Sequence, residues 1–454
     1  MVGVVMLIGA ALLSAAPGDL VWSYATGGPV RSSPAAQYGY VYVGSLDNNV
    51  YCLDEDTGGL LWSCSMLGYV YSSPAVSGGH VYVGCSYEGM VHCLDAWSGY
   101  REWSHYISLL GVDSSPAVSG YDLYVGSDYG NVYRLGASTG TVVWLYNTGG
   151  GVDSSPAVSG GHVYVGSYDQ HVYCLDASTG VPVWYSSTGG PVESSPAVSG
   201  GYVYGGAYDG SVYCLDASTG ALVWLYATGG SVRSSPAVSG GYVYVGSDDD
   251  NVYCLDAATG ALVWPYATGG DVVSSPALSG GYVYVGSNDA NVYCLDAATG
   301  ALVWSYATGG DVESSPAAEH GYVYVGSNDG KVYCLEAGAG DPGEWPMFHR
   351  DAQNSGLLPF EVQLDLGWNM VGYGYTWQPP VNLATVTFTD GSEIKTWEGA
   401  AADGWIQDPA FYYQAGVGYL QLGLPSPPRD SDEIEAGRGY WLLAYRDGLT
   451  LRIP

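Results

Sequence analysis

The residues that could do chemistry in this sequence are recognised by their variation inside an otherwise uniform pattern. The tetrapeptide Ser-Ser-Pro-Ala occurs eight times, and the residue just before it changes from copy to copy. Uniform packing would hold the other positions of the pattern, so we expect the variable position to face a channel or its mouth. The eight residues at this position are Arg31, Tyr71, Asp113, Asp153, Glu193, Arg233, Val273 and Glu313.

The charges at this position suggest what it would bind. Two of the eight residues are basic and four are acidic, so one ring of them carries a net charge of −2. A ring of that charge suits a cationic or polar ligand. A solvated surface that binds nothing is the alternative, and the sequence leaves both open. All of these residues except Val273 are our candidate binding residues.

Aspartates also recur, at the end of a predicted strand and before a Thr-Gly or Ser-Gly turn: Asp54, Asp95, Asp176, Asp216, Asp256 and Asp296. A carboxylate in this place accepts backbone N–H groups, so we interpret the series as turn caps and not as a cation site. The densest acidic run is Asp248-Asp249-Asp250-Asn251. It could hold Ca²⁺ weakly, but it lacks the glycine and distal glutamate of an EF-hand loop, which favours a solvated hairpin tip.

Nine cysteines raise the question of disulfides or metal ligation. Seven share one position of the pattern, on a predicted apolar strand, and are interpreted as small buried hydrophobic residues: Cys52, Cys93, Cys174, Cys214, Cys254, Cys294 and Cys334. Cys64 and Cys85 stand outside that series and are the one pair to test for a disulfide. No Cys-x-x-Cys motif and no histidine-rich cluster indicates zinc, so no metal site is predicted.

A repeat of about forty residues must position all of these groups. Its prolines are Pro34, Pro74, Pro116, Pro156, Pro196, Pro236, Pro276 and Pro316, and its tryptophans are Trp22, Trp62, Trp103, Trp144, Trp184, Trp224, Trp264 and Trp304. Both series advance by 40 to 42 residues, which is the period of a four-stranded propeller blade. In the copy from Asp271 to Gly310, the last three strands are predicted at residues 282–285, 292–295 and 302–306. The proline is placed in the first, innermost strand, where a missing N–H costs no ladder bond.

The phase of the repeat predicts how the ring closes. The predicted strands are apolar or aromatic on both faces, as expected for sheets that pack between two neighbours. The first tryptophan strand, Leu20 to Thr26, precedes every Ser-Ser-Pro, and the last strand, Val332 to Glu336, has no tryptophan strand after it. Pairing these two removes the open edge of the array. The predicted fold is therefore all-β: an eight-bladed β-propeller, residues 17–337, closed by an N-terminal strand.

Composition limits the partners and the location. The chain of 454 residues has 11 Lys and Arg against 44 Asp and Glu, a net charge of −33, so nucleic acid and anionic membrane surfaces are excluded as unassisted partners. No apolar run is long enough for a transmembrane helix. Residues 1–16 are apolar and end in Ser14-Ala15-Ala16, which predicts a secretory signal peptide and a periplasmic, extracellular or cell-surface location; a buried N-terminal strand is the alternative.

The rest of the chain loses the repeat. Residues 338–356 are predicted to be a linker that includes Trp345-Pro-Met-Phe-His-Arg-Asp-Ala-Gln-Asn-Ser-Gly356, and residues 357–454 a small β domain. Strands are predicted there at residues 361–366, 385–389, 394–397, 440–445 and 449–453. Trp377, Trp397, Trp405 and Tyr412 could stack on sugar rings, although the usual place of large aromatic residues favours a small apolar core.

The repeat resembles a known family. The run from Cys294 to Trp304, Cys-Leu-Asp-Ala-Ala-Thr-Gly-Ala-Leu-Val-Trp, together with Ser-Ser-Pro-Ala and Tyr-Val-Gly-Ser, is similar to the pyrroloquinoline-quinone (PQQ)-like repeat. The resemblance implies an eight-bladed propeller whose tryptophans dock adjacent blades. The family contains quinoprotein dehydrogenases and also non-catalytic scaffolds similar to the outer-membrane assembly lipoprotein. The segment at residues 345–356 resembles one that accompanies such repeats in secreted prokaryotic proteins.

The residues favour a scaffold over a dehydrogenase. The units from Gly190 and Gly230 match at about thirty of forty positions, which leaves little room for an asymmetric active site. Only five propeller residues are basic, so few can neutralise the quinone carboxylates: Arg31, Arg101, Arg134, Arg233 and Lys331. Any site would be sought in the irregular second and third units, which contain Glu88, Trp97, Arg101, His105 and Arg134.

We therefore expect a secreted or cell-surface, non-enzymatic module that binds a protein or another envelope component. No catalytic residue, cofactor or metal is assigned, because neither PQQ nor Ca²⁺ has a unique site. A PQQ-dependent dehydrogenase is the alternative, and a carbohydrate-binding adhesin acting through the C-terminal domain is a third hypothesis.

Overall fold

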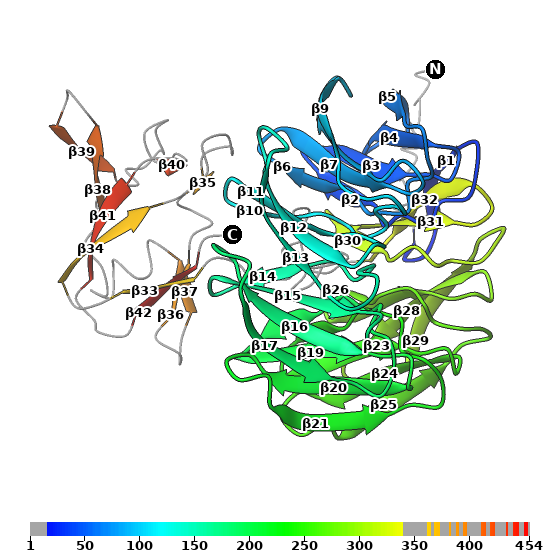
Figure 1. Ribbon diagram of the computed structural model, residues 1–454. Helices are drawn as coiled ribbons and strands as arrows, with labels where there is room; N and C mark the ends of the chain where they lie inside the picture. The colour runs from blue at the N-terminus through cyan, green and yellow to red at the C-terminus, as the bar shows by residue number, and fades with distance from the viewer. Residues whose placement is uncertain are drawn as a thin grey trace, which may run out of the picture. The chain divides into compact units, whose positions relative to one another are not determined.

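Every element in the described part of the chain is a β-strand (Figure 1). The computed structural model describes residues 16–338 and, beyond them, the backbone of strands between residues 361 and 452. The predicted signal peptide, apart from Ala16, and the predicted linker, apart from Gly338, lie outside the described residues.

Residues 20–336 form eight four-stranded sheets, one for each copy of the repeat. Blades 1 to 4 are β2 (Ala35–Gln37), β3 (Tyr40–Gly44), β4 (Asn49–Asp54) and β5 (Leu60–Ser65); β6 (Ala75–Ser77), β7 (His80–Cys85), β8 (Met90–Asp95) and β9 (Arg101–Tyr106); β10 (Ala117–Ser119), β11 (Asp122–Gly126), β12 (Asn131–Gly136) and β13 (Val142–Asn147); β14 (Ala157–Ser159), β15 (His162–Ser167), β16 (His171–Asp176) and β17 (Pro182–Ser187). Blades 5 to 7 are β18 (Ala197–Ser199), β19 (Tyr202–Gly206), β20 (Ser211–Asp216) and β21 (Leu222–Ala227); β22 (Ala237–Ser239), β23 (Tyr242–Gly246), β24 (Asn251–Asp256) and β25 (Leu262–Ala267); β26 (Ala277–Ser279), β27 (Tyr282–Gly286), β28 (Asn291–Asp296) and β29 (Leu302–Ala307).

Blade 8 closes the ring as the phase of the repeat predicts. Its sheet has the order β1 (Leu20–Ala25), β32 (Lys331–Glu336), β31 (Tyr322–Ser327) and β30 (Ala317–Glu319). Trp22 lies opposite Cys334, and Tyr24 lies opposite Val332. The first strand of the propeller thus lies beside the last one (Figure 1). The prediction of an eight-bladed propeller closed by an N-terminal strand is confirmed.

The Ser-Ser-Pro motif joins the blades around the channel. In each blade the first serine hydroxyl accepts the N–H of the glycine in the Tyr-x-Gly run of the second strand, as Ser234 does for Gly246 at 3.0 Å. The second serine accepts the N–H of its counterpart in the preceding blade, as Ser235 does for Ser195 at 2.9 Å. Eight such bonds of 2.8–3.1 Å form a closed circle. The predicted place of the proline inside the first strand is wrong, because the motif is used for this circle and the strand begins after it.

The tryptophans dock adjacent blades, as the resemblance implies. The Trp224 indole N–H donates to the Ala257 carbonyl of the next blade at 2.9 Å. Its ring also covers Gly260, where a Cβ would lie 2.6 Å from Trp224 Cε3 and where φ is +71°. The glycine of each Thr-Gly turn in this arrangement is needed both for a left-handed backbone and for the close approach of the indole.

Burial differs between the inner and outer strands of a blade. The second and third strands are buried on both faces, as predicted. The fourth strand is not: Leu302 and Val303 are exposed, and Trp304 is buried. The prediction of two covered faces is therefore wrong for the fourth strand, because this strand lies on the circumference, where neighbouring blades diverge.

The strands described in the C-terminal region pair only with one another. They are β33 (Glu361–Leu364), β34 (Gly367–Gly372), β35 (Val381–Asn382), β36 (Thr387–Thr389), β37 (Ile394–Thr396), β38 (Ala410–Gln414), β39 (Gly418–Leu422), β40 (Glu433–Ile434), β41 (Gly439–Ala444) and β42 (Leu449–Arg452). Their sheets have the orders β33-β42-β36-β37, β34-β41-β38-β39 and β35-β40.

Candidate functional site

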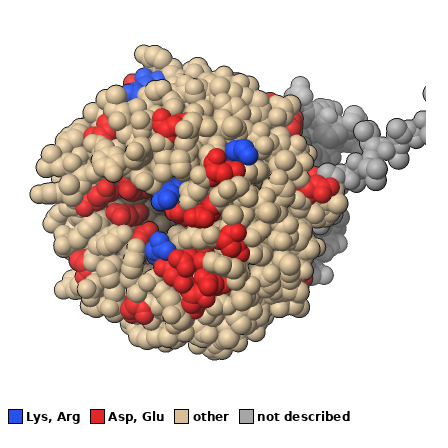
Figure 2. All heavy atoms as spheres, turned by 90° about the vertical axis from the view of Figure 1, so that its right-hand side faces the viewer, with Lys and Arg blue, Asp and Glu red and all other residues tan. Residues whose placement is uncertain are grey.

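The variable residues that precede each Ser-Ser-Pro come together at one mouth of the channel. Arg31 Nη2 lies 3.2 Å from Glu313 Oε1, although the two residues lie near opposite ends of the propeller sequence. Burial raises the pKa of Tyr71, and the charges of Arg31 and Asp113 on either side of it act in opposite directions. Figure 2 shows acidic and basic side chains gathered around a central hollow on one face of the propeller.

A second set of residues, not found by the sequence analysis, completes this mouth. Each lies fifteen residues after a member of the first set, in the turn between the second and third strands. Arg233 contacts Asp248 in this way, and Glu193 contacts Tyr208. The signal was available, because this position also varies among the repeats: Leu46, Ser86, Asp128, Tyr168, Tyr208, Asp248, Asn288 and Asn328.

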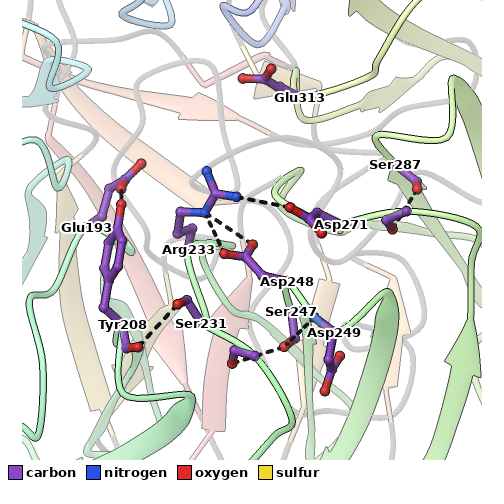
Figure 3. Close-up of polar contacts among 12 residues, drawn as sticks. Glu193, Tyr208, Ser231, Arg233, Ser247, Asp248, Asp249, Asp271, Ser287 and Glu313 are labelled. Carbon is purple, nitrogen blue, oxygen red and sulfur yellow. Dashed lines mark hydrogen bonds and ion pairs between the residues drawn. The ribbon is translucent and has the colours of Figure 1, made fainter.

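Both arginines of the mouth are paired with carboxylates. Arg233 Nε lies 2.9 Å from Asp248 Oδ2, and its Nη2 lies 3.5 Å from Asp271 Oδ2 (Figure 3). Arg31 pairs with Glu313 and also donates from Nε to Asn328 Oδ1 at 3.2 Å. The positive charge of the mouth is therefore already matched.

Four carboxylates of blades 3 to 5, in contrast, have no basic partner among the described ion pairs. We call them the acidic arc: Asp113, Asp128, Asp153 and Glu193. Their described contacts are with hydroxyl and amide groups. The Ser86 hydroxyl donates to Asp113, the Asp113 N–H donates to Asp128 Oδ1 at 3.4 Å, and the Tyr168 and Tyr208 hydroxyls donate to Glu193 Oε2. No arginine or lysine forms an ion pair with the arc among the salt bridges of the described residues.

The pKa values within the acidic arc reflect its burial and the closeness of its carboxylates to one another. Burial, with the nearby charge of Asp128, raises the pKa of Asp113 to about 6. Burial and the charges of Asp128, Asp113 and Glu193 raise the pKa of Asp153 to about 7. Carboxylates held this close repel one another when ionised, and a cation that binds among them removes this repulsion.

The remaining acidic residues singled out by the sequence have local partners. Asp256 Oδ1 accepts the N–H and the hydroxyl of Thr259 at 2.8 and 2.7 Å, so the turn-cap interpretation is confirmed. These bonds lower the pKa of such carboxyls, as for Asp176, where the side-chain bonds from Ser178 and Thr179 lead and the pKa is about 2. In the run Asp248–Asn251, Asp248 binds Arg233 and Asp249 binds Tyr253, so the two carboxylates are held by separate partners.

The irregular second and third units have contacts within and between their blades. Trp97 stacks on Tyr38 with ring centroids 6.3 Å apart, and Arg134 Nε lies 2.8 Å from Asp122. Arg101 donates to the Ser65 carbonyl. Glu88 Oε2 lies 3.2 Å from His92 Nε2. These contacts join neighbouring strands and blades and involve none of the eight variable residues.

The cofactor of the dehydrogenases in the resembled family sets a requirement on the basic residues of the propeller. A quinone with three carboxylates needs unpaired cationic side chains, since an unpaired buried carboxylate is costly. Each of the five basic propeller residues already has a partner: Arg31 with Glu313, Arg101 with Ser65, Arg134 with Asp122, Arg233 with Asp248, and Lys331 with Asp329.

The comparison with protein families assigns the propeller. The model of the family described as outer membrane protein assembly factor BamB matches residues 9–107, 87–204, 169–273 and 250–358. The chain belongs to this family. The resemblance to the PQQ-like repeat is thereby confirmed. A sequence comparison with curated proteins finds no match.

Solved structures with the same fold include a BamB, a designed protein and an alcohol dehydrogenase. BamB from Moraxella catarrhalis is 21% identical, with a TM-score of 0.62 over 70% of this chain and 99% of that one. The computationally designed Ika8 protein is 20% identical, with a TM-score of 0.64 over 70% and 99%. Quinohemoprotein alcohol dehydrogenase from Comamonas testosteroni is 16% identical, with a TM-score of 0.60 over 71% and 77%. At these identities the likeness shows the fold alone.

Among the residues that the structure describes, no helix has the length and apolar character needed to cross a bilayer.

Proposed function

We propose that this chain is a non-enzymatic binding module of the cell envelope or the cell exterior, and that a protein partner docks a cationic segment on the acidic arc. The observation that carries the proposal is the separation of charge at the mouth: the arginines are paired, while Asp113, Asp128, Asp153 and Glu193 have no cationic partner among the described ion pairs. A lysine or arginine of the partner would relieve their mutual repulsion.

Two further observations support this function. The hydrogen-bonded serine circle and the tryptophan contacts make the ring a preorganised surface, so a partner that binds it does not have to order it first. The family's description names an outer membrane protein assembly factor, which is a role in protein assembly and in the cell envelope. The predicted signal peptide agrees with such a location, and residues 1–15 lie outside the described part of the chain.

A test of the proposal compares the acidic arc with carboxylates elsewhere on the ring. The full chain is immobilised and exposed to envelope extract from the source organism, at low and then at high salt. The variant with Asp113→Asn, Asp153→Asn and Glu193→Gln should lose a partner that the wild type retains at low salt and releases at high salt. The control, Asp216→Asn with Asp256→Asn, changes turn caps and should retain it. Equal retention by all three proteins would reject the arc as the docking site.

The alternative dehydrogenase function is tested separately. We expect no dye-linked oxidation of alcohols or sugars after addition of PQQ and Ca²⁺, because four of the five basic residues of the propeller are paired with carboxylates. Turnover that depends on PQQ and disappears in Arg31→Ala or Arg134→Ala would instead establish the enzyme. Glycan binding rests on Trp377, Trp397, Trp405 and Tyr412, whose side chains the structure does not describe, and binding of glycans by the C-terminal region would favour the adhesin.

A further inference from the structure

The regular junction between two blades contains a tyrosine pair. At the junction of blades 5 and 6, Tyr226 of β21 packs on Tyr253 of β24 with ring centroids 5.7 Å apart. The Tyr253 hydroxyl donates to Asp249 Oδ2 at 2.7 Å, and the Ser247 hydroxyl donates to the Gly230 carbonyl at 3.2 Å. The same tyrosine pairs occur elsewhere in the ring: Tyr24 with Tyr51, Tyr146 with Tyr173, Tyr266 with Tyr293, and Tyr306 with Tyr333.

At the junction of blades 1 and 2, all four of these positions change to other residue types. Cys64 lies opposite Val50 as Tyr226 lies opposite Val212, so it takes the place of the first tyrosine. His92 replaces the second tyrosine, and Glu88, four residues before it, replaces the aspartate. Cys85 follows Gly84 as Ser247 follows Gly246. A Tyr-Tyr-Asp-Ser set has become Cys-His-Glu-Cys, and each new residue can ligate a metal ion.

The side chains of blade 2 in this set converge and are shielded from solvent. One ligand atom from each of Cys85, Glu88 and His92 lies within 4.8 Å of the others. Glu88 Oε2 is 3.2 Å from His92 Nε2, and these two side chains are 6% and 0% exposed. Cys85 is fully buried.

Groups around the set hold it in this arrangement. Ser104 Oγ lies 2.7 Å from His92 Nδ1. In the tautomer that donates Nδ1–H to Ser104, the lone pair of Nε2 faces Glu88, which is how a protein orients a histidine ligand. The Leu67 N–H of blade 1 donates to Glu88 Oε2 at 3.2 Å.

We propose that Cys85, Glu88 and His92 bind a thiophilic divalent cation of the Zn²⁺ class, with Cys64 of blade 1 as the fourth ligand. Cys64 packs against the core cluster that contains Cys85 and is close enough for its charge to act on it. Zn²⁺ takes four such ligands in a tetrahedron, at about 2.0 Å from nitrogen or oxygen and about 2.3 Å from sulfur. The ion would join two blades across a junction that lacks the tyrosine pair.

The electrostatics of the junction favour an ion. Two thiolates and one carboxylate around a divalent cation leave a net charge of −1, and Arg101 lies beside them, with its Nη2 3.9 Å from Cys64 Sγ. Burial lowers the pKa of His92, which favours the neutral form of the imidazole.

A second group in the same blade serves as the competing site. His80, Cys93 and Glu102 also have ligand atoms within 4.8 Å of one another. Glu102 is exposed, however, and Cys93 belongs to the cysteine series found in blades that have no such group. Only the group around Cys85 departs from the repeat at every position.

The experiment uses the full chain after removal of metal with a chelator, and Co²⁺ and Zn²⁺ as probes. We expect one Co²⁺ per chain with a sulfur-to-cobalt charge-transfer band, and displacement of that Co²⁺ by Zn²⁺. Cys85→Ser should abolish the band, and His92→Tyr should weaken binding at least tenfold. Both variants restore residues of the regular junction, so the fold should be kept, as circular dichroism would verify.

Two control variants separate this site from the rest of the molecule. Cys254→Ser changes a buried cysteine of the regular series, and Glu102→Val disrupts the competing group; both should bind Co²⁺ like the wild type. The proposal is overturned if the folded wild type shows no sulfur-to-cobalt band. It is also overturned if Glu102→Val loses the metal while Cys85→Ser keeps it, or if Cys64 and Cys85 are found joined in a disulfide in protein that binds no metal.

Discussion

The junction of blades 5 and 6 and the junction of blades 1 and 2 share one backbone but differ in chemistry. Both keep the tryptophan bond, from Trp224 to Ala257 and from Trp62 to Ala96, each at 2.9 Å. Both also keep their link in the serine circle. The side chains at the mouth differ, and so does the outer pair, which is two tyrosines in one junction and cysteine with histidine in the other. The comparison teaches that tryptophan and serine hold the ring together, which frees the other positions to acquire a separate function.

The largest loss of stability should come from removing β1, the strand that closes the ring. Deletion of residues 20–26 exposes the edge of β32 and removes buried Trp22. We expect a loss of several kcal/mol in the free energy of unfolding, since loss of a buried tryptophan side chain alone costs about 3–5 kcal/mol. Val21→Ala, at an exposed position of the same strand, is the control for denaturant unfolding. An unchanged melting temperature of the deletion variant would contradict ring closure by this strand.

A smaller effect is expected from one link of the serine circle. Ser235→Ala removes the acceptor of the Ser195 N–H in a buried place. A buried donor without an acceptor costs about 1–3 kcal/mol, so the free energy of unfolding should fall by about that amount. Ser305→Ala changes an exposed serine of β29 and should have little effect. Equal free energies of unfolding for the two variants would show that the serine circle does not stabilise the ring.

The mouth of the channel should show a dependence of stability on pH with a defined sign. Asp153 has a raised pKa of about 7 in the folded chain, so the folded state binds the proton more tightly than the unfolded state. Its contribution is present below the pKa of the unfolded chain, about 4, and is lost as the pH rises through about 7. Asp153→Asn should therefore remove about 2–3 kcal/mol of the loss in stability between pH 5 and pH 8.

The control for this titration is a carboxyl with the opposite shift. Asp216 has a lowered pKa because of bonds led by the Ser218 hydroxyl, and Asp216→Asn should not reduce the loss of stability towards pH 8. Melting temperatures at several pH values compare the two variants. The same pH profile for wild type and Asp153→Asn would show that Asp153 does not titrate in this range.

The smallest predicted effect is a difference in reactivity between the partly exposed Cys64 and the buried cysteines, and it involves no change in the fold. All nine cysteines are free in the structure, eight of them buried and Cys64 partly exposed, so no Cys64–Cys85 disulfide is present there. In the native, metal-free protein Cys64 should react with an alkylating reagent before the others do, because it is the most accessible. In denaturant without a reductant, titration should find at least seven free thiols. One or none would mean that the blades are cross-linked.

Most of the propeller fold could be predicted, because the residues that mark its strands and turns are close together in the sequence. The turns after Asp256 and Asp296 mark the ends of strands, and the recurring tryptophans mark the fourth strand. The strands β27, β28 and β29 lie within a residue or two of their predicted bounds. The placement of Pro276 and the exposure of Leu302 were predicted wrongly. Both depend on which part of the blade faces the channel and which faces solvent, and a period alone does not contain that information.

The site could be predicted only in part, for a similar reason. The first set of mouth residues was found because it varies in a uniform pattern, whereas Asp128, a member of the acidic arc, was missed. The sequence contained no zinc motif, and the structure nevertheless brings Cys85, Glu88 and His92 together within one blade. Their spacing matches no familiar short motif. A search for Cys-x-x-Cys does not detect a cysteine, a glutamate and a histidine that meet across a hairpin.

The sequence by itself determined the number of blades, the closing strand and the excess of acid, because each follows from a count or from a repeat with a fixed period. Only the tertiary structure decided which side chains meet. The serine circle joins residues forty or more positions apart, the acidic arc combines three blades, and Cys64 meets blade 2 from blade 1. In a propeller each strand pairs within its own blade, while the contacts between blades depend on how the ring closes.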